Sequence, residues 1–407
     1  MTRRLTLAAF LAGLLLLVLP DIIVFYLIMP VPTSQQEDQM ELAYALHGLL
    51  WYTRLLGLML IVASLFQFIK TKKTSIIVWR SIAGAMGLLV VYLLGFHFMP
   101  ENIFREPEQK IFAVAADNTV PDNNYIIGVE LNGVAKAYPL KIVGYHHKIQ
   151  DSIGTQSLLV TYCTMCRTGM VFDPIIEGKY QKFRLVGVAY KNAILEDGDT
   201  KSWWYQSTGI AGAGPLKGMT MKVIPYQQMT LAAWKQLYPN TMIMQPDPKF
   251  MTEYAKLKNY DLNIPTANTD SAKNKSFLPN SWVVGLVVDE SSKAFLWNDL
   301  TKKRVINDFV DNIPVVIALE QDGYSFHSWK RTIADTVLNF TRDSDSLLRD
   351  AETNSHWNWR GECVDGILAG KKLTPVTAYQ TYYHSWDRFY GKKHGKAIYS
   401  IHHDTSF

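Results

Sequence analysis

The chain has 407 residues, a formal net charge of +5 and three cysteines, and roughly its first 100 residues are strongly apolar. This small charge, without a Lys/Arg-rich run after residue 100, offers no electrostatic surface for nucleic acid, so we expect no nucleic-acid partner. Three cysteines are too few for a disulfide framework, and the polar remainder of the chain is long enough to bury a core without one.

The N-terminal region, residues 1–99, predicts three transmembrane helices. An apolar run of about 20 residues crosses the ~30 Å hydrocarbon core of a bilayer as a helix. The first run is not followed by a small-x-small cleavage site, which favours a retained anchor over a signal peptide. The three apolar segments lie at about 5–29, 42–69 and 76–98.

Basic residues set the expected orientation of these helices. Arg3 and Arg4 precede the first segment, and Lys70, Lys72 and Lys73 lie between the second and the third. By the positive-inside rule these residues are cytoplasmic. Three crossings then place the chain after about residue 100 outside the cytoplasm. We therefore expect a membrane-anchored protein whose region after about residue 100 is extracytoplasmic.

Two charged residues interrupt the apolar segments. Asp21 lies in the first segment and Arg54 in the second, at similar depths counted from the outer ends. Charges in hydrocarbon are costly unless they are paired or hydrated, which favours an Asp21–Arg54 ion pair between antiparallel helices. Alternatively, Arg54 snorkels and the second helix begins near Leu55.

The region after the helices contains an internal repeat. The pattern Asp197-x-x-Thr-x-Ser-x-Trp204 recurs as Asp350-x-x-Thr-x-Ser-x-Trp357, and later Gly, Trp and Tyr residues recur at an offset of 152 residues. A repeat of this length suits two subdomains related by a pseudo-twofold axis. The shared Asp, Thr and Ser predict a turn held by side-chain hydrogen bonds. The predicted segments are a linker at 100–124, a first copy at 125–245, a linker at 246–281 and a second copy at 282–401.

Each copy is mostly short strands. Segments rich in β-branched and aromatic residues predict strands at 125–131, 158–163, 170–173 and 183–188. Apolar residues at helical spacing predict helices at 231–238 and 381–390. The expected fold is an N-terminal three-helix transmembrane anchor followed by a β-rich α+β domain built from two pseudo-twofold-related repeats. The sequence has no Rossmann glycine fingerprint, P-loop or nucleophile-elbow serine.

The motif Cys163-Thr-Met-Cys166 occurs in the first copy and has no counterpart in the second, which argues against a purely structural requirement. Two thiolates at this spacing can hold one soft metal ion, and nearby thioether and imidazole groups make the donor set suit copper(I). Structural zinc needs four ligands, and no second Cys-x-x-Cys supplies them, so zinc is less favoured. The predicted metal site comprises Cys163, Cys166, His146 and Met170.

Three other interpretations of the cysteine pair stay open. A Cys-x-x-Cys pair outside the cytoplasm can exchange thiol and disulfide, and Arg167 beside Cys166 would favour a thiolate. The pair can also be a static disulfide, or buried thiols that only pack. Finally, the protein can be a non-catalytic module that binds a small ligand or a protein partner in the cleft between the copies.

Several motifs occur in a fixed order along the two copies. The residues are Tyr138-Pro-Leu140, His146, Asp151, Val160-Thr-Tyr-Cys163, Cys166, Asp197, Thr200, Ser202, Trp204, Gln206, Gly209, Ala211, Gly214-Pro-Leu216 and Gly218. This arrangement, over most of residues 125–400, resembles a family of bacterial extracytoplasmic proteins catalogued as a domain of unknown function. The chain departs from the family pattern at His147, Gln150 and Arg167. The resemblance implies a fold and an extracytoplasmic location, and it implies no reaction.

Overall fold

The computed structural model describes residues 3–35, 39–70, 74–258, 260, 277–289, 291–391 and 397–399. Lys72, Lys73 and, within the predicted linker at 246–281, residues 259 and 261–276 therefore lie outside the described residues. The chain forms two compact units. The first consists of Met1–Arg105 and Gln181–Thr220, and the second of Glu106–Tyr180 and Met221–Phe407. The predicted first copy, 125–245, thus contributes residues to both units.

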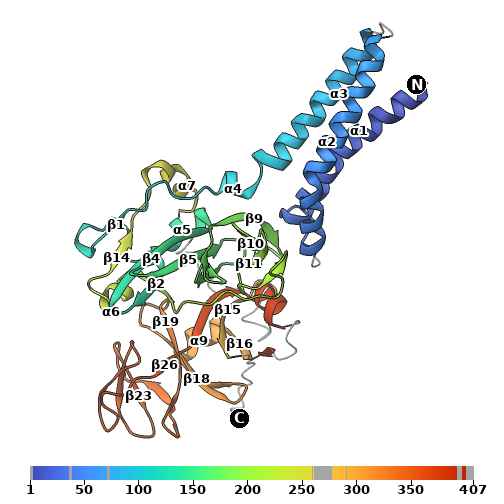
Figure 1. Cartoon of the computed structure of the whole chain (residues 1–407). Coiled ribbons are helices and arrows are strands. Elements are labelled where there is room, and N and C mark those ends of the chain that lie inside the picture. Colours follow the sequence, from blue (N-terminus) through green and yellow to red (C-terminus); the bar gives the residue numbers. More distant parts are fainter. Residues whose placement is uncertain are drawn as a thin grey trace. The chain divides into compact units, whose positions relative to one another are not determined.

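Three long helices of the first unit follow the predicted apolar segments (Figure 1). Within the described part of the chain they are the helices long and apolar enough to cross a membrane. A π-helical turn, Leu93–His97, extends the third, and a short helix, α4 (Pro100–Ile103), follows it. The long helices are α1 (Arg3–Ile28), α2 (Met40–Lys70) and α3 (Thr74–Tyr92).

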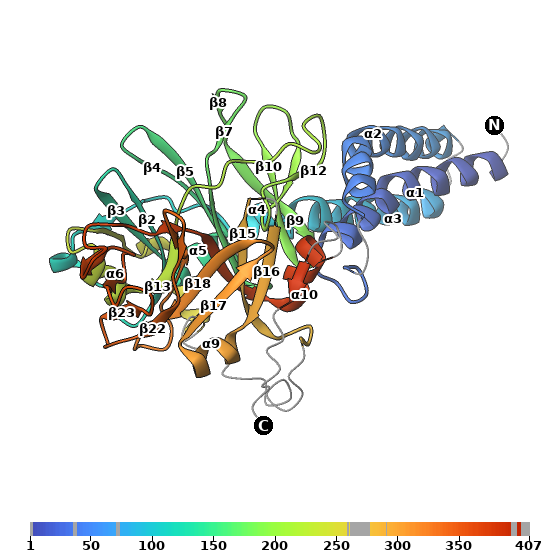
Figure 2. The same cartoon turned by 90° about the horizontal axis from the view of Figure 1, so that it is seen from below.

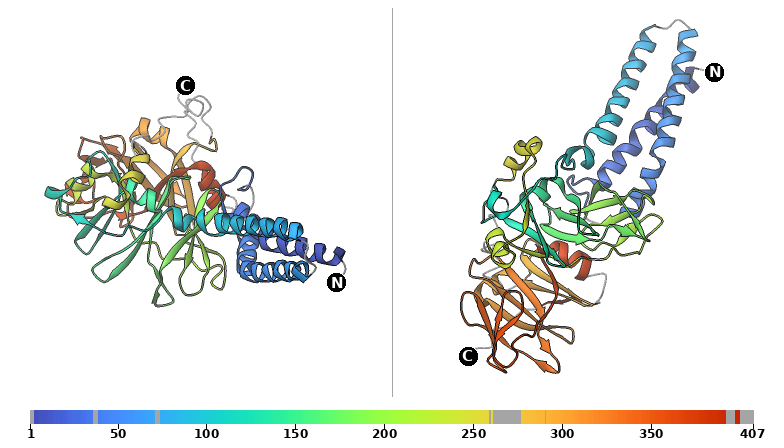
Figure 3. Two further views of the ribbon diagram at one scale, coloured as in Figure 1. Left: turned by 90° about the horizontal axis from the view of Figure 1, so that it is seen from above. Right: turned by 60° about the vertical axis from the view of Figure 1, so that its left-hand side comes forward.

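Helices α1 and α2 run alongside one another (Figure 3), and glycines permit their close approach. A Cβ atom on Gly57 would lie 2.7 Å from the carbonyl oxygen of Gly13, so the two backbones are in contact. Small residues at such crossings allow the packing that drives helix association in lipid. Leu17 and Ile61 fill the space beside this contact and are buried.

The ion pair expected between the first two helices is present. Arg54 donates from Nε to Asp21 Oδ2 at 3.1 Å, and its Nη2 donates to Asp21 Oδ1. Both side chains are buried. Gly95 makes room for the pair, because a Cβ atom there would lie 2.4 Å from Arg54 Nη2. The pair therefore depends on the π-helical turn as well as on α1 and α2.

The first unit also contains an antiparallel sheet with the strand order β12-β11-β10-β9. This sheet packs against the ends of the first two helices: Gly187 approaches Ile28, and Trp203 makes edge contacts with the rings of Tyr44 and His47. The strands are β9 (Phe183–Ala189), β10 (Asn192–Asp197), β11 (Trp203–Tyr205) and β12 (Ala211–Ala213).

The N-terminal part of the second unit has two main sheets. A five-stranded sheet has the order β1-β14-β3-β2-β13, and a three-stranded sheet has the order β4-β5-β6. The strands are β1 (Phe112–Ala113), β2 (Tyr125–Leu131), β3 (Val134–Pro139), β4 (Lys148–Ile153), β5 (Gln156–Cys163), β6 (Thr168–Phe172), β7 (Ile175–Ile176), β8 (Lys179–Tyr180), β13 (Gln227–Thr230) and β14 (Met242–Met244). The helices are α5 (Leu140–His146), α6 (Leu231–Leu237) and α7 (Met251–Lys256).

The C-terminal part of the second unit has sheets in the orders β27-β15-β16-β28, β17-β18-β19-β26 and β22-β23-β24-β25, and Figure 2 shows β15 beside β16. The strands are β15 (Trp282–Val288), β16 (Ser291–Leu296), β17 (Val305–Val310), β18 (Ile313–Leu319), β19 (Phe326–Lys330), β20 (Thr332–Ile333), β21 (Thr336–Val337), β22 (Phe340–Arg342), β23 (Leu347–Asp350), β24 (His356–Asn358), β25 (Cys363–Asp365), β26 (Thr374–Pro375), β27 (Thr377–Tyr382) and β28 (Ala397–Tyr399). The helices are α9 (Trp297–Lys303) and α10 (Tyr383–Trp386).

The two parts of the second unit share one hydrophobic core. Ile127 and Val160 from the first part and Val284 and Ile317 from the second are fully buried in the same cluster. The predicted strands at 125–131, 158–163, 170–173 and 183–188 are present with shifts of a few residues, and the helix predicted at 231–238 is α6. The chain is therefore rich in β structure after its N-terminal helices, as expected.

The helix predicted at 381–390 was placed too early. Thr381 belongs to β27, which pairs antiparallel with β15 over Thr377–Tyr382, and helical structure begins only at Tyr383. Pairing with a buried neighbouring strand outweighed the helical spacing of the apolar residues. The correction matters because it places Thr381 on a strand beside the cysteine motif.

We expect Gly285→Ala to destabilise the second unit. A Cβ atom on Gly285 would lie 2.0 Å from Cζ3 of Trp386, which is fully buried and has no room to move. Overpacking of this kind costs about 3 kcal/mol of unfolding free energy. Chemical denaturation followed by tryptophan fluorescence measures the loss, and an unchanged midpoint would contradict the packing described.

Candidate functional site

The cysteine motif forms the turn of the β5–β6 hairpin. The buried residues of β5, Leu158–Cys163, include β-branched Val160 and Thr161 and the aromatic Tyr162, which favour a strand. Cys163 ends β5 and pairs with Thr168 at the start of β6, so Cys166 lies in the connecting turn. Arg167 closes this turn with a φ of 57°. The hairpin thus brings the two cysteines together by local geometry alone.

The two thiols form no disulfide, and they are buried and hydrogen-bonded. Neither Cys163 nor Cys166 exposes any surface, and the Cys166 thiol points toward the Cys163 carbonyl oxygen at 3.9 Å. A hydrogen bond with the Cys166 thiol, followed by burial, raises the pKa of Cys163 well above its usual value. Cys163 is therefore a neutral thiol at physiological pH.

Arg167 is a buried cation beside this dithiol. It is 8% exposed, and its Nη2 donates to the carbonyl oxygen of Tyr260 at 2.8 Å. Its guanidinium lies over the rings of Tyr260, at 4.3 Å, and Trp282, at 5.5 Å. Among the described residues no carboxylate pairs with it. At Cys163 the inter-thiol hydrogen bond and burial dominate the pKa, and the thiolate that Arg167 was expected to favour beside it, at Cys166, stays a prediction.

Strand β27, in the C-terminal part of the second unit, forms hydrogen bonds with the turn that carries Cys166. The backbone N–H of Tyr382 donates to the carbonyl oxygen of Cys166 at 3.0 Å, and the Thr381 hydroxyl donates to the same oxygen at 3.2 Å. The hydroxyls of Thr381 and Thr168 are 2.7 Å apart. These contacts fix the backbone that carries Cys166. Sequence reasoning missed Thr381 because it assigned this residue to a helix.

Buried tyrosines surround the cysteine hairpin. Burial raises the pKa values of Tyr162, Tyr226 and Tyr379 well above the usual value, and it also raises that of Tyr260. These phenols therefore stay protonated and act as hydrogen-bonding groups. Their aromatic character was visible in the sequence, but their convergence on one hairpin requires contacts between distant segments.

The other predicted metal ligands have protein partners. His146, the last residue of α5, is fully buried, and its Nε2 lies 2.7 Å from the Tyr254 hydroxyl. Met170 lies on β6, and its sulfur accepts a hydrogen bond from the Tyr226 hydroxyl at 3.2 Å. Cys363 belongs to a different hydrophobic cluster. The described residues contain no group of three or more His, Cys, Asp and Glu side chains that could hold a metal ion.

A small cavity lies beside the hairpin and is lined from both parts of the second unit. Its volume is about 10 Å³, close to the ~10–15 Å³ that one water molecule requires. The indole N–H of Trp282 is buried without a hydrogen-bond partner among the described groups. The lining residues are Tyr125, Leu140, Tyr162, Arg167, Gln228, Tyr260, Trp282 and Gln380.

The residues 106–393 match a family model described as "Protein of unknown function (DUF3179)". The chain belongs to this family. Searches of curated proteins and of solved structures found no match. The region shared with the DUF3179 family includes the cysteine hairpin, the surrounding tyrosines and the cavity, and it begins after helices α1–α3.

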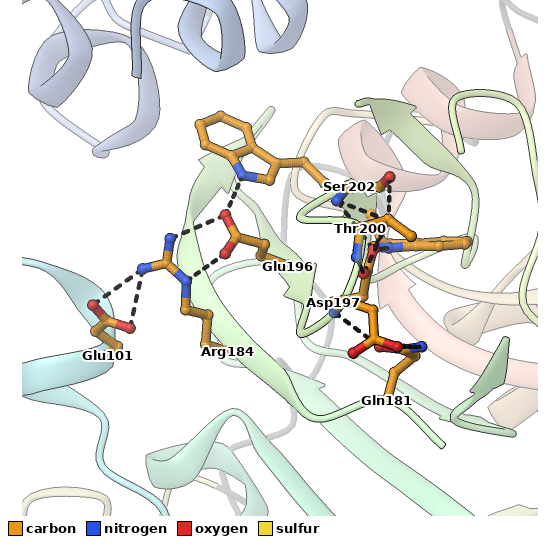
Figure 4. Close-up of polar contacts among 10 residues, drawn as sticks. Glu101, Gln181, Arg184, Glu196, Asp197, Thr200 and Ser202 are labelled. Atoms are coloured by element: carbon orange, nitrogen blue, oxygen red, sulfur yellow. Dashed lines mark hydrogen bonds and ion pairs between the residues drawn. The ribbon is translucent and has the colours of Figure 1, made fainter. Parts of the chain in front are cut away.

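The DUF3179 region also contains both Asp-Thr-Ser-Trp turns, and the structure gives them a structural role. Asp197 is buried and accepts hydrogen bonds from Thr200 N at 2.6 Å, from Ser202 N at 3.0 Å and from Trp204 Nε1 at 2.9 Å (Figure 4). A carboxylate that already accepts three hydrogen bonds stabilises the turn, as predicted from the sequence.

The second turn has the same hydrogen bonds. Asp350 accepts from Thr353 N at 2.6 Å and from Trp357 Nε1 at 2.9 Å, and the hydroxyls of Thr353 and Ser355 are 2.7 Å apart. Each tryptophan beneath its turn is fully buried. These carboxylates are therefore parts of the fold, and the cysteine hairpin remains the candidate site.

Proposed function

We propose that this protein is anchored in the bacterial inner membrane by α1–α3, with its N-terminus cytoplasmic and the chain after about residue 100 periplasmic. Three long apolar helices and the basic residues at their expected cytoplasmic ends support this arrangement. The buried Asp21–Arg54 pair suits a low-dielectric surrounding, since each charge has its partner. Alkaline phosphatase fused after residue 105 should be active, and an inactive fusion would contradict the orientation.

We further propose that the DUF3179 region arose by internal duplication into two copies related by a pseudo-twofold axis. The matching hydrogen bonds of Asp197 and Asp350 support this origin. A second matched contact is the stacking of a buried tryptophan against a strand glycine, Trp234 on Gly128 and Trp386 on Gly285. Two such contacts at corresponding places are hard to explain by convergence.

For the site itself, we propose that Cys163 and Cys166 bind one copper(I) ion as thiolates. The observation that carries the proposal is the pair of adjacent thiols, not joined in a disulfide, beside a buried cation that has no carboxylate partner among the described residues. Two thiolates and one Cu⁺ ion have a net charge of −1. Arg167 would balance that charge, and buried charges are tolerated when they are balanced.

The surroundings favour a soft monovalent ion over zinc. Thiolate and thioether sulfur select copper(I), and Met170 supplies a thioether on the same hairpin. Zinc requires four ligands, whereas the described residues bring no third His, Cys, Asp or Glu to the two sulfurs. His146 would have to leave the Tyr254 hydroxyl to take part. The sulfurs alone therefore form the core of the proposed site.

Copper(I) titration of the full-length protein in detergent, under anaerobic conditions and against a chromogenic chelator, tests this function. We expect one equivalent to bind. Cys163→Ser or Cys166→Ser should weaken binding about 1,000-fold, because each removes one of two strong ligands. Cys363→Ser is the matched control and should bind like the wild type, since that thiol lies in another cluster. Equal binding by all four proteins would disprove the site.

Thiol–disulfide exchange is the second candidate, and the hydrogen bond between the thiols favours it because the sulfurs are already close. The raised pKa of Cys163 opposes it, since the thiolate is the attacking species. A redox titration of copper-free protein separates the two functions. A reversible two-electron couple, retained in the absence of bound copper, would establish the exchange reaction.

Binding of a small ligand or a protein partner in the cleft between the copies is a third proposal, from another class of function. The cavity there joins residues of both parts and contains the unpartnered Trp282 N–H. Its volume admits about one water molecule, so an organic ligand would have to open it. The two cysteines of the copper site already lie together on one hairpin, and that site is therefore preferred.

A further inference from the structure

The first unit contains a polar cavity of about 200 Å³ near the ends of α1 and α2. Its charged lining comes from four different elements, and aromatic rings complete the wall. The polar lining residues are Asp21, His47, Arg54, Glu101 and Arg184, and the apolar ones include Phe25, Trp51 and Phe96. A cavity of this size has room for a group of several non-hydrogen atoms, since benzene enters one of about 150 Å³.

Both signs of charge line this cavity. Arg184 donates from Nε and Nη2 to the two oxygens of Glu196, at 2.7 and 3.0 Å, and from Nη1 to Glu101 at 3.1 Å (Figure 4). Arg54 uses Nε and Nη2 on Asp21. The two guanidinium groups thus face three carboxylates, of which Asp21 and Glu101 line the cavity, and a net anionic ligand would add to this excess of negative charge.

Two donors at the cavity remain uncommitted. Within the described residues, Arg54 Nη1 and the His47 imidazole have no hydrogen-bond partner. His47 contacts the Trp203 ring, which holds the imidazole at the cavity wall. The cavity thus offers hydrogen-bond donors at these two groups and carboxylate acceptors at Glu101 and Asp21.

An apolar groove of about 840 Å³ lies between α1 and α3 and leads toward this cavity. Groove residues Val18 and Ile22 lie within one helical turn of Asp21 on α1, and Val90 lies one turn before the cavity residue Leu94. From Leu11 to Ile22 the groove extends ~16 Å at 1.5 Å per residue. That length matches half of the ~30 Å hydrocarbon core of a bilayer.

We propose that the groove and the cavity together bind one zwitterionic phospholipid. The acyl chain occupies the α1–α3 groove, the phosphate accepts hydrogen bonds from Arg54 Nη1 and His47, and the ammonium group donates to Glu101 and Asp21. A head group with both charges fits a lining with both charges, whereas a net anionic head group would leave one charge uncompensated. This inference rests on the proposed membrane anchoring and is independent of the copper site.

Native mass spectrometry of the full-length protein tests the inference. The delipidated protein is mixed in detergent with equal amounts of phosphatidylethanolamine, phosphatidylglycerol and ubiquinone. We expect one phosphatidylethanolamine to be retained, at least about fivefold above phosphatidylglycerol, because a net anionic head group would add to the excess of carboxylates around the cavity. His47→Phe should reduce this preference. Preferential retention of phosphatidylglycerol or ubiquinone would overturn the proposal.

A pair of matched substitutions tests the groove. Ala12 lines the groove, so Ala12→Phe should fill it and lower phospholipid retention about tenfold. Ala63 is exposed on α2 and does not line the groove, so Ala63→Phe should retain lipid like the wild type. Equal retention by both variants would refute the groove. Extraction of membranes with alkaline carbonate checks anchoring separately: a protein released without detergent contradicts the anchor, whereas an anchored protein without bound lipid contradicts only this inference.

Discussion

Copper(I) affinity is expected to rise about 100-fold for each unit of pH between pH 6 and 8, because binding displaces one proton from each of two thiols. The raised pKa of Cys163 keeps its proton bound throughout this range, so protons compete with the metal at every point. Competition titrations against a chelator whose own protonation is known measure the slope. A tenfold change in affinity per pH unit would mean that only one thiol proton is displaced. A flat profile would exclude both thiolates as ligands.

Arg167→Gln provides the control for this pH dependence. The substitution removes the buried cation that balances the proposed copper dithiolate, so affinity should fall about tenfold at every pH while the slope stays the same. If copper(I) affinity no longer changed with pH in this variant, Arg167 would instead act by setting a thiol pKa.

Copper-free protein should show the opposite pH trend in stability. A thiol whose pKa is raised on folding contributes stability that is fully present below its unfolded pKa of about 8.5 and is lost as the pH rises through the higher folded value. Unfolding free energy should therefore decline above about pH 8.5, with buried tyrosines adding to the decline at higher pH. Cys163→Ser should reduce the fall in unfolding free energy that begins near pH 8.5.

Asp350→Ala should lower the free energy of unfolding by about 3–5 kcal/mol, because several hydrogen-bond donors lose their acceptor at once. Asp350 is fully buried and accepts hydrogen bonds from the backbone and hydroxyl of Thr353 and from the indole of Trp357. Without the carboxylate, the indole N–H of the fully buried Trp357 loses its partner away from water, and the N–H of the half-buried Thr353 loses its acceptor as well. Chemical denaturation measures the loss.

The matched control for this substitution is Asp335→Ala. Asp335 is exposed and makes no hydrogen bond or ion pair with the described residues. Its removal should change stability by less than about 0.5 kcal/mol. If Asp350→Ala proves as mild as Asp335→Ala while copper binding is lost, the Asp-Thr-Ser-Trp turn would have a functional role and not the structural one assigned here.

The sequence predicted those features whose physical cause is local. Apolar runs long enough to cross a bilayer can be read from composition, and α1–α3 follow them. The Asp, Thr, Ser and Trp side chains of each turn lie within eight positions of one another, so their hydrogen bonds need no distant partner. The closeness of Cys163 and Cys166 is likewise set by the hairpin turn that joins them.

Only the tertiary structure decided the environment of those cysteines. Thr381 and Trp282 reach the hairpin from segments more than a hundred residues away, and Tyr260 comes from the linker. Burial of the hairpin, together with the hydrogen bond between the thiols, raises the pKa of Cys163, which the neighbouring sequence did not indicate. Solvation of a side chain depends on everything packed around it, and a linear pattern records only its neighbours along the chain.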